Sequence, residues 1–145
     1  MVFISDFLGA YDALRKDYPE LTQYFDMALK STRSVIYTDW IEPGEHGLTN
    51  TDKESIKAYQ EVFDAAVARI IKAMPKNLCD FDKYRYIATF IDVHNTYDKT
   101  LKTQGAYWPC YNVIINKTSV CAGYAETFLY LCRQAGLWCE MWDGT

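Results

Sequence analysis

The chain has 145 residues, half of them hydrophobic, so it is long and apolar enough to form one domain with a buried core. Its formal net charge is −4 at pH 7 and it has no lysine–arginine stripe, which argues against a nucleic-acid partner. No stretch of about 18 apolar residues occurs, so we expect no membrane span. Residues 1–4 lack the basic start and the length of a secretory signal, which leaves a cytoplasmic location or export after processing open.

The N-terminal part of the chain predicts two helices and a short strand. Apolar residues recur at helical spacing over residues 5–17, and this pattern ends before Pro19. A second helical pattern covers residues 21–29. Residues 34–38 predict a short strand before a turn at residues 43–44.

The clearest helical pattern lies between a capping signal at residues 50–52 and Pro75. Its apolar stripe is unbroken, which predicts an amphipathic helix that packs one face on the core. The stripe consists of Ile56, Tyr59, Phe63, Val67, Ile70 and Met74. A further helix is predicted over residues 82–95, with a stripe of Tyr84, Ile87, Ile91 and Val93.

The stretch over residues 96–118 is aromatic and has little helical pattern, so we predict a long loop. Loops of this length often carry function, and this one precedes a helix that begins with a cysteine. We therefore expect it to form one wall of a substrate cleft, with Tyr107 and Trp108 lining that wall.

A cysteine stands at the start of the last predicted helix. Ser119 is a suitable N-cap, and apolar residues then recur at helical spacing through Phe128, Leu129 and Cys132. In the first turn Cys121 faces unpaired backbone N–H groups and the positive end of the helix dipole, which favour the nucleophilic thiolate. The same N–H groups would bind the oxyanion that forms when a thiolate attacks an amide carbonyl. The alternative is that Cys121 is a small buried apolar residue that closes the helix start.

The motif around this cysteine resembles the nucleophile helix of the transglutaminase-like superfamily. Residues 120–125 read V-C-A-G-Y-A, and in the microbial branch of that family the helix typically reads V-C-x-G-Y-A. Residues 128–129 (F-L) and 135–137 (A-G-L) continue the resemblance. In the family a short strand then ends near a glycine, and residues 143–144 (D-G) stand where that glycine is expected.

The resemblance extends upstream to residues 97–98 (Y-D) and 106–107 (A-Y), and it covers residues 83–145 in all. It implies that Cys121 occupies the family's nucleophile position. It also implies an α+β domain of the papain-like and transglutaminase-like cysteine proteinase fold. This chain would hold mostly the helical half of that fold and the start of its sheet.

Length and composition predict a single domain over residues 1–145. We expect a helical extension over residues 1–80, and the resemblance implies the start of the transglutaminase-like core over residues 81–145. A strand is expected over residues 137–142. In the family a histidine and then an aspartate, on strands after the cysteine helix, partner the thiolate, and no histidine follows Cys121. We expect the chain to be truncated before these partners and inactive by itself; a natural relic without the base is the alternative.

The reaction implied by the resemblance is attack of the Cys121 thiolate on an amide carbonyl of a protein or peptide, which gives a thioester acyl-enzyme. Water would then yield a peptidase or deamidase, and an amine would yield a transglutaminase; we rank hydrolysis first. Tyr107 would donate its hydroxyl to the oxyanion or simply pack in the protein, and Gln104 is a further amide donor. Gly123 would let substrate or a neighbouring chain segment approach the helix closely. No metal or organic cofactor is implied.

Two other functions stay open as alternatives to the enzyme. One is a non-catalytic binding module that keeps the cleft without the base. The other is a helical interaction domain in which the cysteine motif is a coincidence. The two histidines do not replace the base, because His94 is expected to cap the last carbonyls of its helix and His46 belongs to a turn-rich loop. An exposed strand edge over residues 137–142 makes a homodimer a further expectation.

Overall fold

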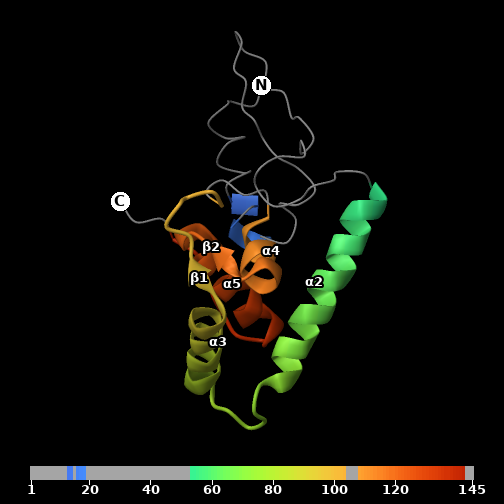
Figure 1. The fold of residues 1–145 in the computed structure, drawn as a ribbon. Coiled ribbons are helices and arrows are strands. Elements are labelled where there is room, and N and C mark those ends of the chain that lie inside the picture. Colours follow the sequence, from blue (N-terminus) through green and yellow to red (C-terminus); the bar gives the residue numbers. More distant parts are fainter. Residues whose placement is uncertain (1–12, 15, 19–52, 104–107, 143–145) are drawn as a thin grey trace, which may run out of the picture.

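The computed structural model describes residues 13–14, 16–18, 53–103 and 108–142 (Figure 1). In these residues the fold is mainly helical with one two-stranded parallel sheet, which is the α+β class predicted from the sequence. Residues 13–14 and 16–17 are helical, within the first predicted helix. The predicted second helix and the predicted strand at residues 34–38 lie outside the described residues.

The long helix α2 (Lys53–Ala73) confirms the strongest sequence pattern. Phe63, Val67 and Ile70 are buried along one face, whereas Tyr59 and Met74 are partly buried at its ends. The stripe therefore packs α2 against the rest of the domain, along one side of the molecule in Figure 1.

Helix α3 (Asp80–His94) begins two residues before the predicted start. Ile87 and Ile91 are buried against the core, as the stripe predicted, but Val93 is 69% exposed and does not share that face. Asp80 and Asp82 lie in the first turn, where their negative charges interact favourably with the positive end of the helix dipole.

The predicted loop over residues 96–118 is wrong over most of its second half. Helix α4 (Pro109–Tyr111) runs directly into the π-helical turn η2 (Asn112–Asn116). Proline at the first helical position suits a helix start, and Val113 and Ile114 are buried. The segment is too short to show a helical period, which is why the sequence pattern missed it.

Two short strands also lie in this predicted loop. Strand β1 (Thr96–Tyr97) pairs in parallel with β2 (Thr118–Ser119), with Thr96 opposite Thr118 and Tyr97 opposite Ser119. Lys117, in the left-handed conformation (φ 61°), turns the chain from η2 into β2. The sheet therefore precedes the cysteine helix, whereas the family resemblance led us to expect the start of the sheet after that helix.

Helix α5 (Cys121–Gln134) follows β2 after one residue. Its N-cap is Val120 and not the predicted Ser119, because Ser119 belongs to β2. The helix ends in a Schellman motif: Gly136 (φ 73°) donates to the Arg133 carbonyl at 3.0 Å, and Leu137 donates to the Cys132 carbonyl at 2.9 Å.

The strand predicted over residues 137–142 is absent, since these residues have no regular secondary structure. No strand of the described chain lies beside them to supply a ladder. Trp138 and Trp142 are 76% and 83% exposed. The strand edge on which the predicted homodimer depends is therefore not formed in residues 137–142. No helix of the described part is long and apolar enough to cross a membrane.

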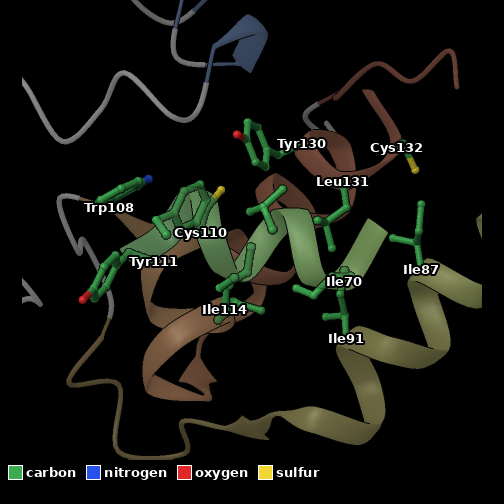
Figure 2. Close-up of a cluster of buried hydrophobic side chains, with 14 of the residues drawn as sticks. Ile70, Ile87, Ile91, Trp108, Cys110, Tyr111, Ile114, Tyr130, Leu131 and Cys132 are labelled. Atoms are coloured by element: carbon green, nitrogen blue, oxygen red, sulfur yellow. The ribbon is translucent and has the colours of Figure 1, made fainter. Parts of the chain in front are cut away.

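The core lies between α2, α3, α4 and α5, and aromatic rings fill one end of it (Figure 2). The Phe63 ring lies 4.5 Å from the Trp108 ring and 5.4 Å from the Tyr130 ring, measured between centroids. Ile87 and Leu131 are fully buried in the same cluster, which packs α3 on α5. This packing fixes α5, and thereby Cys121, relative to the rest of the described chain.

Candidate functional site

Cys121 is the first residue of α5, and its side chain is exposed. The preceding residue, Val120, is buried, so the chain enters the helix from the core and turns the thiol towards solvent. The interpretation of Cys121 as a buried residue that closes the helix start is therefore wrong. The thiol stands at the end of a 14-residue helix, where the backbone dipoles sum to a partial positive charge.

The first turn of α5 has backbone donors that point towards the thiol end. Gly123 and Tyr124 both donate to the Val120 carbonyl, at 3.0 and 3.4 Å. In the described chain neither a carbonyl nor a side chain accepts from the N–H groups of Cys121 and Ala122. These two N–H groups are the donors that an oxyanion next to the Cys121 sulfur would use.

Gly123 is required by the close packing of β2 on this turn. A Cβ at position 123 would lie 2.0 Å from Ser119 Oγ, 2.8 Å from Ser119 Cβ and 3.2 Å from Val113 Cγ2. The segment that approaches Gly123 is therefore the strand that leads into the helix, and not an empty surface for substrate. Glycine at position 123 therefore lets strand β2 pack directly on the first turn of α5, so that only Val120 separates the strand from the helix.

Asp98 lies at the same edge of the sheet as Cys121. Both strands are parallel, so the residues that follow them, Asp98 and Val120, leave the sheet at its carboxyl edge. The Asp98 amide donates to the Ser119 carbonyl at 2.9 Å, which joins the two exits.

The Asp98 carboxylate accepts four hydrogen bonds from the turn that follows it. The amide and hydroxyl of Thr100 donate to Oδ1 at 2.9 and 2.6 Å, and those of Thr103 donate to Oδ2 at 2.7 and 2.9 Å. These bonds, the Thr100 hydroxyl first among them, lower the pKa of Asp98 to about 2. The carboxylate fixes the loop beside the candidate site, and its acceptor capacity is used within that loop.

His94 lies at the other edge of the sheet. It ends α3, just before β1 begins, whereas Cys121 follows the end of β2. Its ring stacks on Phe90 with 4.4 Å between centroids, and Nδ1 lies 2.9 Å from the Phe90 carbonyl oxygen. This contact within the last turn is the structural role predicted for His94, and the parallel strands separate it from the thiol. His46 lies outside the described residues.

Contrary to the sequence prediction, Trp108 does not line a cleft wall but lies in the core. Its side chain is 2% exposed and packs on Phe63 and Tyr111, with the Tyr111 ring centroid 5.0 Å away. Trp108 is therefore a core residue, because the helical segment that follows it carries its ring inward. Tyr107 and Gln104, the predicted oxyanion and amide donors, lie outside the described residues.

The structure buries a carboxylate in α5 that no sequence pattern singled out. Glu126 is 1% exposed, one helical turn beyond the first turn that carries Cys121. Next to it, Thr127 is fully buried, and in the described part of the chain its hydroxyl has no hydrogen-bond partner. A Glu-Thr pair has the composition of a polar helix face, so only the burial of these residues in the structure identifies them as interior.

No model of a known protein family matches the chain, and no curated protein is similar to it. The candidate site is therefore defined by its own geometry: the exposed Cys121 thiol, the open first turn of α5, the close approach at Gly123 and the loop fixed by Asp98. Within the described ranges no group of three or more His, Cys, Asp or Glu side chains is arranged to hold a metal ion.

Proposed function

We propose that this chain carries the nucleophile of a transglutaminase-like cysteine enzyme with a papain-like fold, and that Cys121 attacks amide carbonyls of a protein or peptide substrate. The observation that supports this proposal best is the exposed thiol at the first position of α5, beside two N–H groups that have no acceptor among the described residues. The V-C-A-G-Y-A motif adds the family resemblance to that geometry.

In the proposed reaction the Cys121 thiolate adds to the carbonyl carbon, and the carbonyl oxygen becomes an oxyanion. The N–H groups of Cys121 and Ala122 donate to that oxyanion. Collapse of the intermediate breaks the carbon–nitrogen bond, releases the amine after it takes up a proton, and leaves a thioester. Attack by water releases the acid, so we place peptidase or deamidase activity ahead of protein cross-linking.

The described residues do not supply a donor for the proton that the leaving amine takes up. In the family this proton comes from a histidine after the cysteine helix, and no histidine follows Cys121 in this sequence. His94 lies at the opposite edge of the sheet from Cys121 and is not placed to donate this proton. Its position favours a second candidate function. That candidate is a binding module that keeps the open helix start of α5 and binds the carbonyl of a peptide without cleaving it.

An activated ester separates the two functions, because its phenolate leaves without a proton. With p-nitrophenyl acetate, the enzyme proposal predicts a burst of p-nitrophenolate and an acetyl thioester on Cys121, which mass spectrometry locates and hydroxylamine removes. Cys121→Ala should abolish the burst. Cys79→Ala is the matched control, because Cys79 is the other exposed thiol at a helix start.

Acetylation of Cys121 no faster than that of Cys79 would contradict the enzyme proposal and leave the binding module. A burst that persists in Cys121→Ala would contradict it as well, since another group would then be the nucleophile.

A further inference from the structure

Two cysteines lie next to each other at the opposite end of α5 from the candidate site. Cys132 is fully buried in the last turns of the helix, and Cys139 packs half-buried against the same core. The Cys139 side chain contacts the buried cluster to which Cys132 belongs. Burial raises the pKa of the Cys132 thiol to about 12, and the neighbouring Cys139 sulfur adds to that shift.

The chain reversal after α5 creates this contact. The Schellman motif at Gly136 turns the chain back, so that Leu137 binds the carbonyl of Cys132 itself. A side chain from α5 holds the returning segment as well, since Arg133 Nη2 donates to the Cys139 carbonyl at 3.5 Å.

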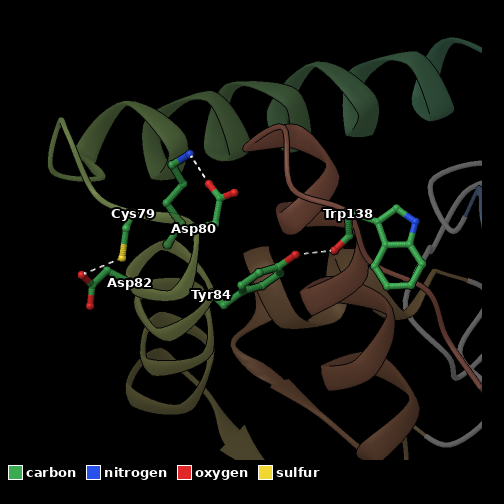
Figure 3. Close-up of polar contacts among 6 residues, drawn as sticks. Cys79, Asp80, Asp82, Tyr84 and Trp138 are labelled. Atoms are coloured by element: carbon green, nitrogen blue, oxygen red, sulfur yellow. Dashed lines mark hydrogen bonds and ion pairs between the residues drawn. The ribbon is translucent and has the colours of Figure 1, made fainter.

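Helix α3 holds the same segment from the other side. The Tyr84 hydroxyl donates to the Trp138 carbonyl at 2.5 Å, as Figure 3 shows. Burial raises the pKa of Tyr84, and the Cys132 and Cys139 sulfurs raise it further. Hydrogen bonds from two helices therefore hold the segment that carries Cys139 against the end of α5 that carries Cys132.

We propose that Cys132 and Cys139 form a reversible disulfide and are a thiol–disulfide exchange site for low-molecular-weight disulfides such as glutathione disulfide. The Cys139 thiolate, the more accessible of the two, attacks one sulfur of the disulfide and displaces one glutathione thiolate. The Cys132 thiol then gives up its proton and attacks Cys139 Sγ, which displaces the second glutathione. The two protein thiols lose two electrons and two protons, and the small disulfide takes them up as two thiols.

The other cysteines do not compete for this pairing. Cys110 belongs to α4, and Figure 2 shows it apart from Cys132 in the buried cluster. Cys121 lies eleven residues before Cys132 on the same helix, which is about 16 Å along the helix axis and too far for a disulfide. Cys79 lies at the start of α3, where its thiol donates to the Asp82 carboxylate at 3.2 Å. The proposed disulfide would tie the exit of α5 to its last turns, without using the Cys121 thiol.

The test is a linkage map of the whole chain after incubation with excess glutathione disulfide, acid quenching and alkylation. Trypsin cuts after Arg133 and separates Cys132 from Cys139, and a glutamate-specific protease cuts after Glu126 and separates Cys132 from Cys121. We expect a linked pair of peptides that contain Cys132 and Cys139, with a mass lower by two hydrogen atoms than the sum of the reduced peptides. Dithiothreitol should restore both thiols.

Variants keep the test specific. Cys139→Ser should leave Cys132 as a thiol after incubation with glutathione disulfide, and this thiol should be alkylated only after denaturation. Cys79→Ser is the matched control and should form the same linked pair as the wild type. Recovery of Cys132 as a free thiol from oxidised wild-type protein would overturn the proposal, as would a stable glutathione adduct on Cys139 or a link from Cys139 to Cys121. The wild-type map decides the question even if the variant does not fold.

Discussion

Two helices of this protein begin at an exposed cysteine, and their first turns differ in charge. Helix α3 has Cys79 as its N-cap, and the aspartates Asp80 and Asp82 follow in its first turn. Helix α5 begins with Cys121, and Ala122 and Gly123 follow, so its first turn has neither an acidic side chain nor a side-chain cap from the described residues.

The difference shows what a helix start can be used for. In α3 the carboxylates neutralise the positive end of the helix, and the Cys79 thiol donates to Asp82 at 3.2 Å, as Figure 3 shows. In α5 the equivalent third position is Gly123, and the first turn has no acidic side chain. The first arrangement stabilises a helix, whereas the second leaves its donors for a negative charge that arrives from outside.

Filling the first turn of α5 should have the largest effect. In Gly123→Ala the new Cβ lies 2.8 Å from Ser119 Cβ, which is fixed to strand β2 and cannot rotate away. Such overpacking costs about 3 kcal/mol, and the better helix propensity of alanine offsets at most about 1 kcal/mol. We expect urea unfolding to show a loss of about 2 kcal/mol in the free energy of unfolding.

A compensating change checks the cause of this loss. Ser119→Gly removes both Ser119 atoms that clash, so the double variant with Gly123→Ala should be less destabilised than the sum of the two single variants. Strict additivity would show that the close approach of β2 is not what requires glycine at position 123.

The Asp98 loop should contribute the next largest effect, and this effect depends on pH. The folded-state pKa of Asp98 is lowered to about 2, below an unfolded value of about 3.9. Its stabilising contribution is therefore complete above about pH 5 and is lost as the pH falls towards about 2. Asp98→Asn should lower the urea midpoint at pH 7, and the difference from the wild type should shrink in acid. A difference that is unchanged down to pH 2 would contradict the role of the carboxylate.

A carboxylate placed in the open turn should make α5 resemble α3. Ala122 is exposed, so Ala122→Asp adds a negative charge beside Cys121 without a clash. We expect alkylation of Cys121 by iodoacetamide to slow by roughly two- to fivefold, and less so in high salt, because the charge disfavours the thiolate. Ala122→Asn is the uncharged control. Equal rates in the two variants would mean that charge in this turn does not act on the thiol.

The reverse change in α3 should have the smallest effect. Asp82→Asn removes the carboxylate that accepts from Cys79 and keeps the shape of the side chain. Alkylation of Cys79 should become roughly twofold faster, and Cys121 in the same molecules serves as the internal standard. A slower Cys79 would show that the Asp82 contact activates this thiol and does not hold its proton.

The sequence predicted those elements whose pattern is long enough to show a period. Helices α2 and α3 followed from their apolar stripes, and a helix that starts near Cys121 followed from a cap signal and the V-C-A-G-Y-A motif. The cap residue was wrong by one position, because Ser119 is equally suited to a helix cap and to the short strand that it forms. Strands of two residues have no alternation to detect.

The remaining differences arise from tertiary contacts. Trp108 looks like an exposed loop aromatic in sequence, but it fills the core beside Phe63 because residues 109–116 are helical. Residues 137–142 have the apolar composition of a strand but no neighbouring strand in the described chain to pair with. The Asp98 turn depends on hydrogen bonds from Thr100 and Thr103, which no periodicity reveals.

The most direct measurement is the alkylation rate of Cys121 and of Cys79 in the same wild-type sample at pH 7, resolved by mass spectrometry of their separate peptides. Both thiols are exposed and both stand at helix starts, Cys79 as the N-cap of α3 and Cys121 as the first residue of α5. The account predicts that Cys121 reacts at least roughly two- to fivefold faster, because only its helix start is free of carboxylates. Equal rates, or a faster Cys79, would contradict the claim that the open first turn of α5 activates the Cys121 thiol.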